Sequence, residues 1–141
     1  MIAPPIVLEP DYAAAASELG RALADWNEQQ AGPRHTHLFA LTIRAGDGDL
    51  LAGLAGEMFW TFLYISLLWV KDGHRRKGYG AALMQRAEAL GREHPCSVAF
   101  LNTMSFQAPE FYRKCGYEQF ATVPYSTGPH TRMFFAKRLS Q

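Results

Sequence analysis

The stretch from residue 62 to residue 83 constrains the fold more than any other part of the chain. Residues 62–70 (FLYISLLWV) place apolar side chains on both alternating faces, as expected of a strand that is covered on two sides. A short turn rich in glycine and basic residues follows this strand. Beyond the turn, apolar residues recur at helical spacing: Tyr79, Leu83, Ala87 and Leu90. The sequence therefore predicts a central strand that leads through a turn directly into a helix.

Further elements are predicted on either side of this junction. The Asp47–Gly48 pair suits a tight hairpin between two strand-like segments. The strand after the helix should run parallel to the central one, because a helical crossover joins them. The predicted strands are residues 6–8, 38–44, 50–60, 62–70, 97–104, 117–123 and 132–139. Three helices are predicted, which begin at Pro10–Asp11, after Gly80 and at Gln107. Gly91 and Pro95 end the second helix, and Gly116 ends the third. We expect an α+β fold, a three-layer α/β/α arrangement around a mixed, mostly antiparallel sheet, in a single domain over residues 1–141.

Composition and charge narrow the function classes. A chain of 141 residues with 48% hydrophobic and 19% charged residues is of ordinary globular type. The net charge of +1 gives no general field to hold a polyanion, so an anion must be bound by a local arrangement. The two cysteines lack metal-ligand spacing, and the N-terminus has no basic region leading into an apolar run. We therefore expect a cytoplasmic protein with no membrane partner.

The turn after the central strand has the features of an anion-binding loop. Unpaired amides at a helix start and the positive end of the helix dipole hold phosphate oxygens, and glycines let a ligand approach the backbone. Arg75, Arg76 and Lys77 add charge. The nucleoside triphosphate loop is excluded, because Gly80 is followed by alanines instead of Lys-Ser/Thr. The dinucleotide pattern lacks its third glycine, since position 83 is Leu.

Two motifs together carry a family resemblance. Arg75, Gly78 and Gly80 form an Arg-x-x-Gly-x-Gly pattern, and residues 105–117 (SFQAPEFYRKCGY) are similar to an Asn-x-x-Ala-x-x-x-Tyr-x-x-x-Gly-Phe motif. Both resemble the GCN5-related N-acetyltransferase (GNAT) family, and the tail, residues 128–139, resembles a bacterial subgroup of its small members. The resemblance implies transfer of an acetyl group from acetyl-coenzyme A to a primary amine in a ternary complex. It also implies a possible homodimer.

The resemblance further implies which residues hold the co-substrate. The central strand would pair with the pantetheine arm, and the loop would hold the diphosphate. Ser105 stands where many relatives have Asn. The residues expected at coenzyme A are Leu68, Trp69, Val70, Arg75, Arg76, Lys77, Gly78, Tyr79, Gly80, Ala81, Ser105, Ala108 and Tyr112. Exchange of Gly80 for Asp should abolish coenzyme A binding and leave the fold intact.

Acetyl transfer needs a neutral amine, a stabilised oxyanion and a proton for the departing thiolate. The resemblance places Tyr112 beside the sulfur, where a protonated phenol can supply that proton. Tyr112 is therefore the expected catalytic residue. The base that takes the proton of the amine is open between Glu57 and His130.

Other interpretations are weaker. His35 and His37 could project to one side of a strand, but no third metal ligand is near in sequence, so no metal site is expected. Residues 74–77 are too few for a nucleic-acid site without a wider basic face. The main alternative to an enzyme is a non-catalytic sensor that binds coenzyme A or acyl-coenzyme A and transfers nothing. The sequence does not identify the amine acceptor.

Overall fold

The computed structural model describes residues 2–124 and 128–140, and the chain divides into two compact units, residues 1–34 and residues 35–141. The first unit contains helix α1 (Tyr12–Ala31), none of whose residues is buried. The side chain of Asp11 caps it by accepting a hydrogen bond from the Ala14 amide at 3.1 Å. The predicted helix start is confirmed. That this helix forms one domain with the sheet stays a prediction.

The predicted first strand at residues 6–8 is wrong. Residues 2–9 lie in neither a helix nor a strand. An isolated strand is not stable without a neighbour for its amides and carbonyls. Apolar composition alone therefore misled the prediction here.

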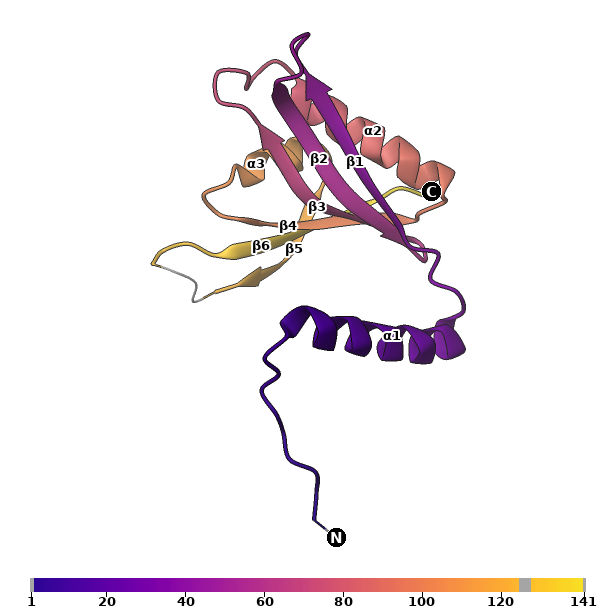
Figure 1. Ribbon diagram of the computed structural model, residues 1–141. Helices are drawn as coiled ribbons and strands as arrows, with labels where there is room; N and C mark the ends of the chain where they lie inside the picture. Colours follow the sequence, from indigo (N-terminus) through magenta and orange to yellow (C-terminus); the bar gives the residue numbers. More distant parts are fainter. Residues whose placement is uncertain (1, 125–127, 141) are drawn as a thin grey trace. The chain divides into compact units, whose positions relative to one another are not determined.

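The second unit is built on one mixed sheet of six strands within the described residues (Figure 1). The strands are β1 (His37–Arg44), β2 (Leu50–Phe59), β3 (Phe62–Val70), β4 (Val98–Met104), β5 (Glu118–Val123) and β6 (Arg132–Arg138), and their spatial order is β1-β2-β3-β4-β6-β5. Only β3 and β4 are parallel. The α+β class and the mixed, mostly antiparallel sheet are therefore confirmed, and the predicted central strand lies inside the sheet.

Two helices of this unit position the site. Helix α2 (Tyr79–Glu93) contacts β1, β2 and β3, and the short helix α3 (Pro109–Lys114) follows β4 (Figure 1). The buried core comprises Ala52, Leu54, Met58, Leu63, Ile65, Leu83, Met84, Ala87, Cys96, Ala99, Leu101, Tyr117, Phe135 and Leu139. Among the described residues, no helix has both the length and the apolar character needed to span a membrane.

A β-bulge in the middle of β3 shapes the sheet. Ala55 of β2 pairs with Leu67, whereas the next residue, Gly56, pairs with Ile65. Ser66 is thus the extra residue, and its hydroxyl donates a hydrogen bond to the carbonyl of Ala55 at 3.1 Å. Such a bulge bends the strand that carries it.

Beyond the bulge, β3 and β4 separate. Their parallel pairing covers only Phe62 to Tyr64 of β3, and Figure 1 shows the two strands diverging from there. The expectation that β3 is covered on both faces is wrong, because only Leu63 and Ile65 of this strand are buried. The apolar residues after Ser66 line the pockets, and of these Leu68 and Val70 also pack against the core.

A buried polar cluster joins α2 to the end of the chain. Glu88 of α2 is 4% exposed and accepts hydrogen bonds from Lys137 Nζ at 2.8 Å and from the Tyr117 hydroxyl at 3.0 Å. Lys137 also donates to the carbonyl of Cys115 at 2.8 Å. Burial, followed by the charge of Glu88, strongly raises the pKa of the Tyr117 phenol, so this tyrosine stays a neutral donor.

Candidate active site

A pocket of about 780 Å³ opens between the loop after β3 and helix α3. We call it the loop pocket. It is lined by Leu68, Trp69, Val70, His74, Arg75, Arg76, Gly78, Tyr79, Gly80, Ala81, Phe106, Gln107, Ala108, Phe111, Tyr112 and Lys114. A volume of this size suits a cofactor or small molecule.

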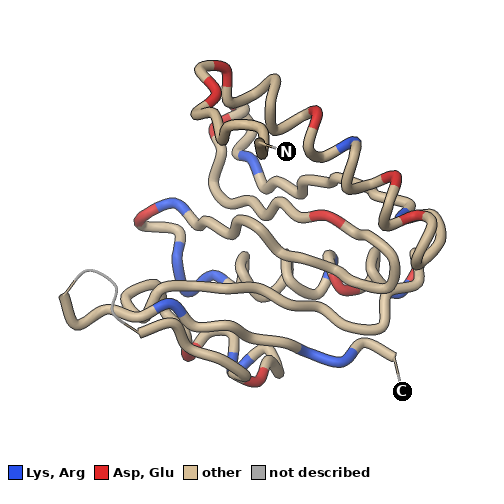
Figure 2. The backbone as a smooth tube through the Cα atoms, turned by 90° about the horizontal axis from the view of Figure 1, so that it is seen from below, with Lys and Arg blue, Asp and Glu red and all other residues tan. Residues whose placement is uncertain are grey.

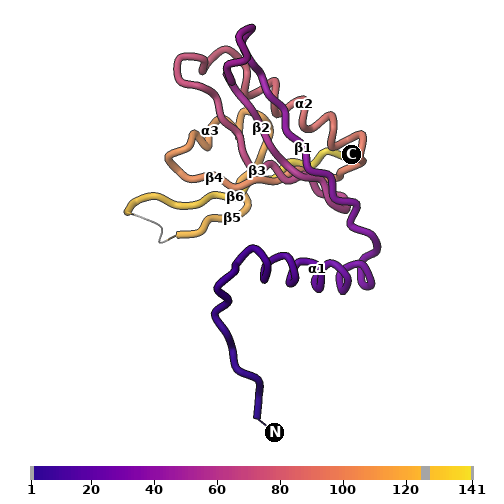
Figure 3. The backbone as a smooth tube through the Cα atoms, in the orientation of Figure 1, coloured from indigo at the N-terminus to yellow at the C-terminus, as the bar shows by residue number. Residues whose placement is uncertain are grey.

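The start of α2 presents unpaired amides to the loop pocket. The chain passes from β3 through the loop into α2 (Figure 3), and the first main-chain hydrogen bond of the helix runs from the Ala82 amide to the Gly78 carbonyl at 3.0 Å. The amides of residues 79–81 precede this bond and have no partner within the helix. All three residues line the pocket. A helix start of this kind binds phosphate oxygens well.

The charged residues of the loop pocket favour an anion. Its lining carries Arg75, Arg76, Lys114 and His74, and no acidic side chain among the described residues. Figure 2 shows basic and acidic residues spread along the rest of the chain, in agreement with the net charge of +1. The loop pocket is therefore locally positive although the chain as a whole is close to neutral, as anion binding without a general field requires.

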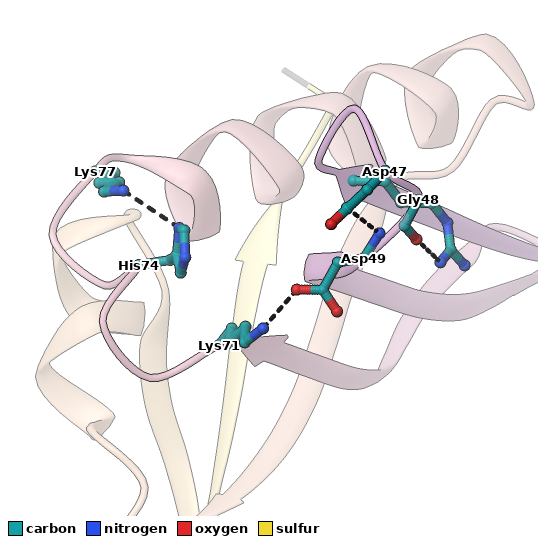
Figure 4. Close-up of polar contacts among 7 residues, drawn as sticks. Asp47, Gly48, Asp49, Lys71, His74 and Lys77 are labelled. Atoms are coloured by element: carbon teal, nitrogen blue, oxygen red, sulfur yellow. Dashed lines mark hydrogen bonds and ion pairs between the residues drawn. The ribbon is translucent and has the colours of Figure 1, made fainter.

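An ion pair at one end and a hydrogen bond at the other hold the loop (Figure 4). Lys71 Nζ lies 2.5 Å from Asp49 Oδ2, and this hydrogen bond and the charge of Lys71 lower the pKa of the Asp49 carboxyl. Lys77 Nζ lies 3.2 Å from His74 Nδ1. Lys77 contacts the loop itself and does not line the loop pocket.

The loop pocket brings together all of the residues predicted at coenzyme A except Lys77 and Ser105. The Ser105 hydroxyl accepts a hydrogen bond from the Thr131 amide at 3.0 Å, and the Ser105 amide donates to the Thr131 carbonyl at 2.8 Å. Ser105 thus joins the end of β4 to the start of β6. A role for it at the co-substrate stays a prediction.

Gly80 has a packing role that the sequence analysis did not anticipate. A Cβ atom at this position would lie 3.0 Å from Cζ and 3.2 Å from Cε1 of Phe111. Glycine here therefore lets α2 and α3 approach each other closely. The exchange of Gly80 for Asp would disturb this contact, so it is a poor test of ligand binding alone.

A second pocket of about 340 Å³ lies in the gap between β3 and β4. We call it the strand pocket. It is lined by Tyr64, Ile65, Ser66, Leu67, Leu68, Leu101, Asn102, Thr103, Met104, Gln107, Tyr112 and Arg132. Leu68, Gln107 and Tyr112 line both pockets, so the two spaces meet at these three residues.

Tyr112 of α3 is half-buried at this junction. Its ring packs against those of Phe135, at 5.9 Å between centroids, and Tyr117, at 6.4 Å. Burial, with a smaller effect of Cys115, raises the pKa of the Tyr112 phenol above its usual value of 10. The phenol therefore remains protonated at neutral pH and can donate a proton.

The two candidate bases lie outside both pockets as the described residues define them. Glu57 of β2 is the register partner of Tyr64, so their side chains share one face of the sheet. His130 packs edge-on against Phe106 at 4.9 Å. His37 packs against His94 at 4.8 Å, and among the described residues no group of three or more His, Cys, Asp and Glu side chains could hold a metal ion.

Sequence reasoning missed several pocket residues, among them Ser66, Phe106, Gln107, Phe111, Lys114 and Arg132. Ser66 could have been noticed as the polar residue in an otherwise apolar strand. Gln107 accepts hydrogen bonds from the Met104 amide at 2.8 Å and the Thr103 hydroxyl at 3.3 Å, which fixes the turn between β4 and α3. No local pattern marks that contact.

The comparison with protein families decides the classification. Residues 6–117 match the model described as the acetyltransferase (GNAT) family. The chain belongs to the GNAT acetyltransferase family. This assignment confirms the family predicted from the two motifs, and it supports the predicted class of enzyme, an acetyltransferase that uses acetyl-CoA.

Individual relatives agree with the family assignment. The chain is 44% identical over 78 residues to blasticidin-S acetyltransferase of Streptomyces morookaense, a match that covers 55% of this chain and 57% of that protein. It is 29% identical over 119 residues to acetyltransferase Atu2258 of Agrobacterium fabrum, covering 81% of this chain and 87% of that one. The chain thus spans little more than half of the first relative and most of the second.

A solved structure confirms the predicted GNAT fold. The crystal structure of an acetyltransferase from Bacillus cereus superposes with a TM-score of 0.84 at 28% identity, over 94% of this chain and 97% of the other. The two chains therefore share one overall fold over nearly their whole lengths.

Proposed function

We propose that this GNAT protein transfers an acetyl group from acetyl-CoA to a primary amine by direct attack in a ternary complex. The observation that carries the proposal is the meeting of the two pockets at Tyr112. One pocket has the charge and the amides for a diphosphate, and the other is a small polar space. The junction between them holds a protonated phenol.

The diphosphate would be held by the amides of residues 79–81 with Arg75 and Arg76 around it. The pantetheine arm would lie along Leu68, Trp69 and Val70. Beyond Tyr64, β3 has no ladder to β4, so the main-chain groups of β3 that face the gap can bind the arm instead of a strand. This arrangement would bring the thioester to the junction of the pockets.

The acceptor amine would enter through the strand pocket. Its neutral nitrogen attacks the thioester carbon, the C–N bond forms, and the carbonyl oxygen takes up negative charge. When the C–S bond breaks, the thiolate takes the proton of the Tyr112 hydroxyl, which is restored from solvent. After the attack the nitrogen loses one proton, through water, to a base, for which Glu57 and His130 are the candidates.

The test follows release of free thiol from acetyl-CoA across a library of primary amines, with mass spectrometry of the products. We expect thiol release in step with formation of an N-acetyl product for at least one acceptor. Tight binding of coenzyme A without any acetylated product would contradict the proposal and favour the non-catalytic sensor.

A further inference from the structure

Arg132 distinguishes the strand pocket from a neutral amine site. The residues that line this pocket in the described part of the chain include one basic side chain, Arg132, and no acidic one. The other polar groups that line the pocket are uncharged amides and hydroxyls, which belong to Tyr64, Ser66, Asn102, Thr103 and Gln107. The pocket is therefore electropositive, which is unexpected for a space that would receive only an amine.

A chain of hydrogen bonds holds the guanidinium at the pocket. Arg132 Nη1 donates to Oδ1 of Asn102, and Asn102 Nδ2 donates to the hydroxyl of Tyr64 at 3.2 Å. The ring of Tyr64 in turn stacks on Phe100, with 5.0 Å between centroids. This chain runs from β6 through β4 to β3, and the side chain of Arg132 itself is exposed to solvent.

The guanidinium keeps binding capacity for a ligand. It carries five N–H donors, and the contact to Asn102 uses one of its terminal nitrogens. No carboxylate of the described residues forms an ion pair with Arg132. A planar guanidinium binds a carboxylate through two parallel hydrogen bonds, a geometry that a lysine does not offer.

We infer that the acceptor is a small amine that also carries a carboxylate, with the carboxylate bound by Arg132 and the amine directed to the junction at Tyr112. This inference rests on the proposed acetyl transfer. Arg132 and Tyr112 line the same pocket, and its volume of about 340 Å³ is at the lower end of the range for small-molecule sites. This volume fits an acceptor of amino-acid size.

The experiment compares matched acceptors that differ only in charge. Amino acids with their amine two to six carbons from the carboxylate are assayed beside their carboxamides, by thiol release from acetyl-CoA. We expect the wild-type protein to prefer the acid by about tenfold or more in kcat/KM within the accepted pairs. Equal use of acid and amide would overturn the inference and leave the proposed function standing.

Two variants assign the preference to one side chain. Arg132→Met should abolish the preference for the acid by raising the KM for the acid about tenfold or more, with a much smaller change in the turnover of the amide and in the KM for acetyl-CoA. Arg138→Met, at the far end of β6 and outside both pockets, should keep the preference. An equal loss of activity with acid and amide in Arg132→Met would assign Arg132 to the fold or to co-substrate binding and refute the inference.

Failure of every acceptor in the wild-type protein despite coenzyme A binding would contradict the proposed function, and with it the inference.

Discussion

The phenol of Tyr112 is half-buried at the point where the two pockets meet, and burial raises its pKa. If it protonates the departing thiolate, Tyr112→Phe should lower kcat roughly 100-fold or more and leave the KM for acetyl-CoA almost unchanged. Because the phenol is active in its protonated form and its pKa is raised, activity that depends on it should persist up to the ordinary tyrosine pKa of 10 and fall only above it. Steady-state kinetics across pH would measure both effects.

Tyr12→Phe is the matched control, because Tyr12 lies in α1 and is 83% exposed. This variant should behave as the wild-type protein. If Tyr112→Phe kept full turnover over the whole pH range, the phenol would not be the acid.

Arg75 tests the charge of the loop pocket with less risk to packing than Gly80. Arg75→Glu replaces an attraction for the diphosphate with a repulsion, so the Kd for coenzyme A should rise about tenfold or more. Lys77→Glu changes the same charge two residues away, outside the pocket, and should weaken binding much less. Calorimetric titration at two salt concentrations would separate them. Equal effects would mean that only the general charge of the loop matters.

The backbone beside the bulge of β3 leaves no space for a side chain at Gly56. A Cβ atom there would lie 2.5 Å from the carbonyl oxygen of Tyr64 and 3.0 Å from Cζ of Phe39. Because a backbone oxygen in a strand cannot move aside, Gly56→Ala should lower the free energy of unfolding by about 1–3 kcal/mol. A Cβ atom at Gly46 would meet no heavy atom within 4 Å. The free energy of unfolding of Gly46→Ala, measured by denaturant titration, should therefore lie within about 0.5 kcal/mol of that of the wild-type protein. Equal free energies of unfolding for the two variants would contradict the prediction, because they would mean that the backbone at the bulge shifts to make room for the added Cβ atom.

At the scale of the elements, the Glu88 cluster ties α2 to β6 and to the turn after α3. Removal of the ammonium in Lys137→Met leaves the carboxylate of Glu88, which is 4% exposed, without its cation. This should lower the free energy of unfolding by about 3 kcal/mol. In the double variant with Glu88→Gln the loss should be smaller, because no buried charge remains. Urea denaturation of the single and double variants would measure the coupling, and strictly additive losses would contradict it.

Most elements could be predicted from the sequence because their signals are local. The Asp47–Gly48 hairpin, the strand at residues 62–70 and the cap of α1 at Asp11 depend on neighbouring residues, and all three are confirmed. The separation of β3 and β4 could not be predicted, because it arises from the register shift at Ser66 and from pairing with a strand about 35 residues away. The failed strand at residues 6–8 shows the same limit, since its partner could not be read from the sequence.

The site divides in the same way. The loop from Arg75 to Gly80 and the position of Tyr112 are marked by motifs in consecutive residues, and the structure gathers all of them except Lys77 in one pocket. Arg132, Asn102 and Gln107 come together only through strand pairing and side-chain hydrogen bonds, for which no local pattern exists. Sequence therefore predicts the part that would hold the co-substrate better than the part that would choose the acceptor.

For the molecule as a whole, the proposed acetyl transfer requires one arrangement: the diphosphate of acetyl-CoA at the start of α2, and the thioester at the junction beside Tyr112. A crystal structure with bound coenzyme A tests this most directly. We predict diphosphate oxygens within hydrogen-bond distance of the amides of residues 79–81, pantetheine along Leu68 to Val70, and the sulfur next to Tyr112. Coenzyme A bound elsewhere, with these amides facing only solvent, would contradict the account.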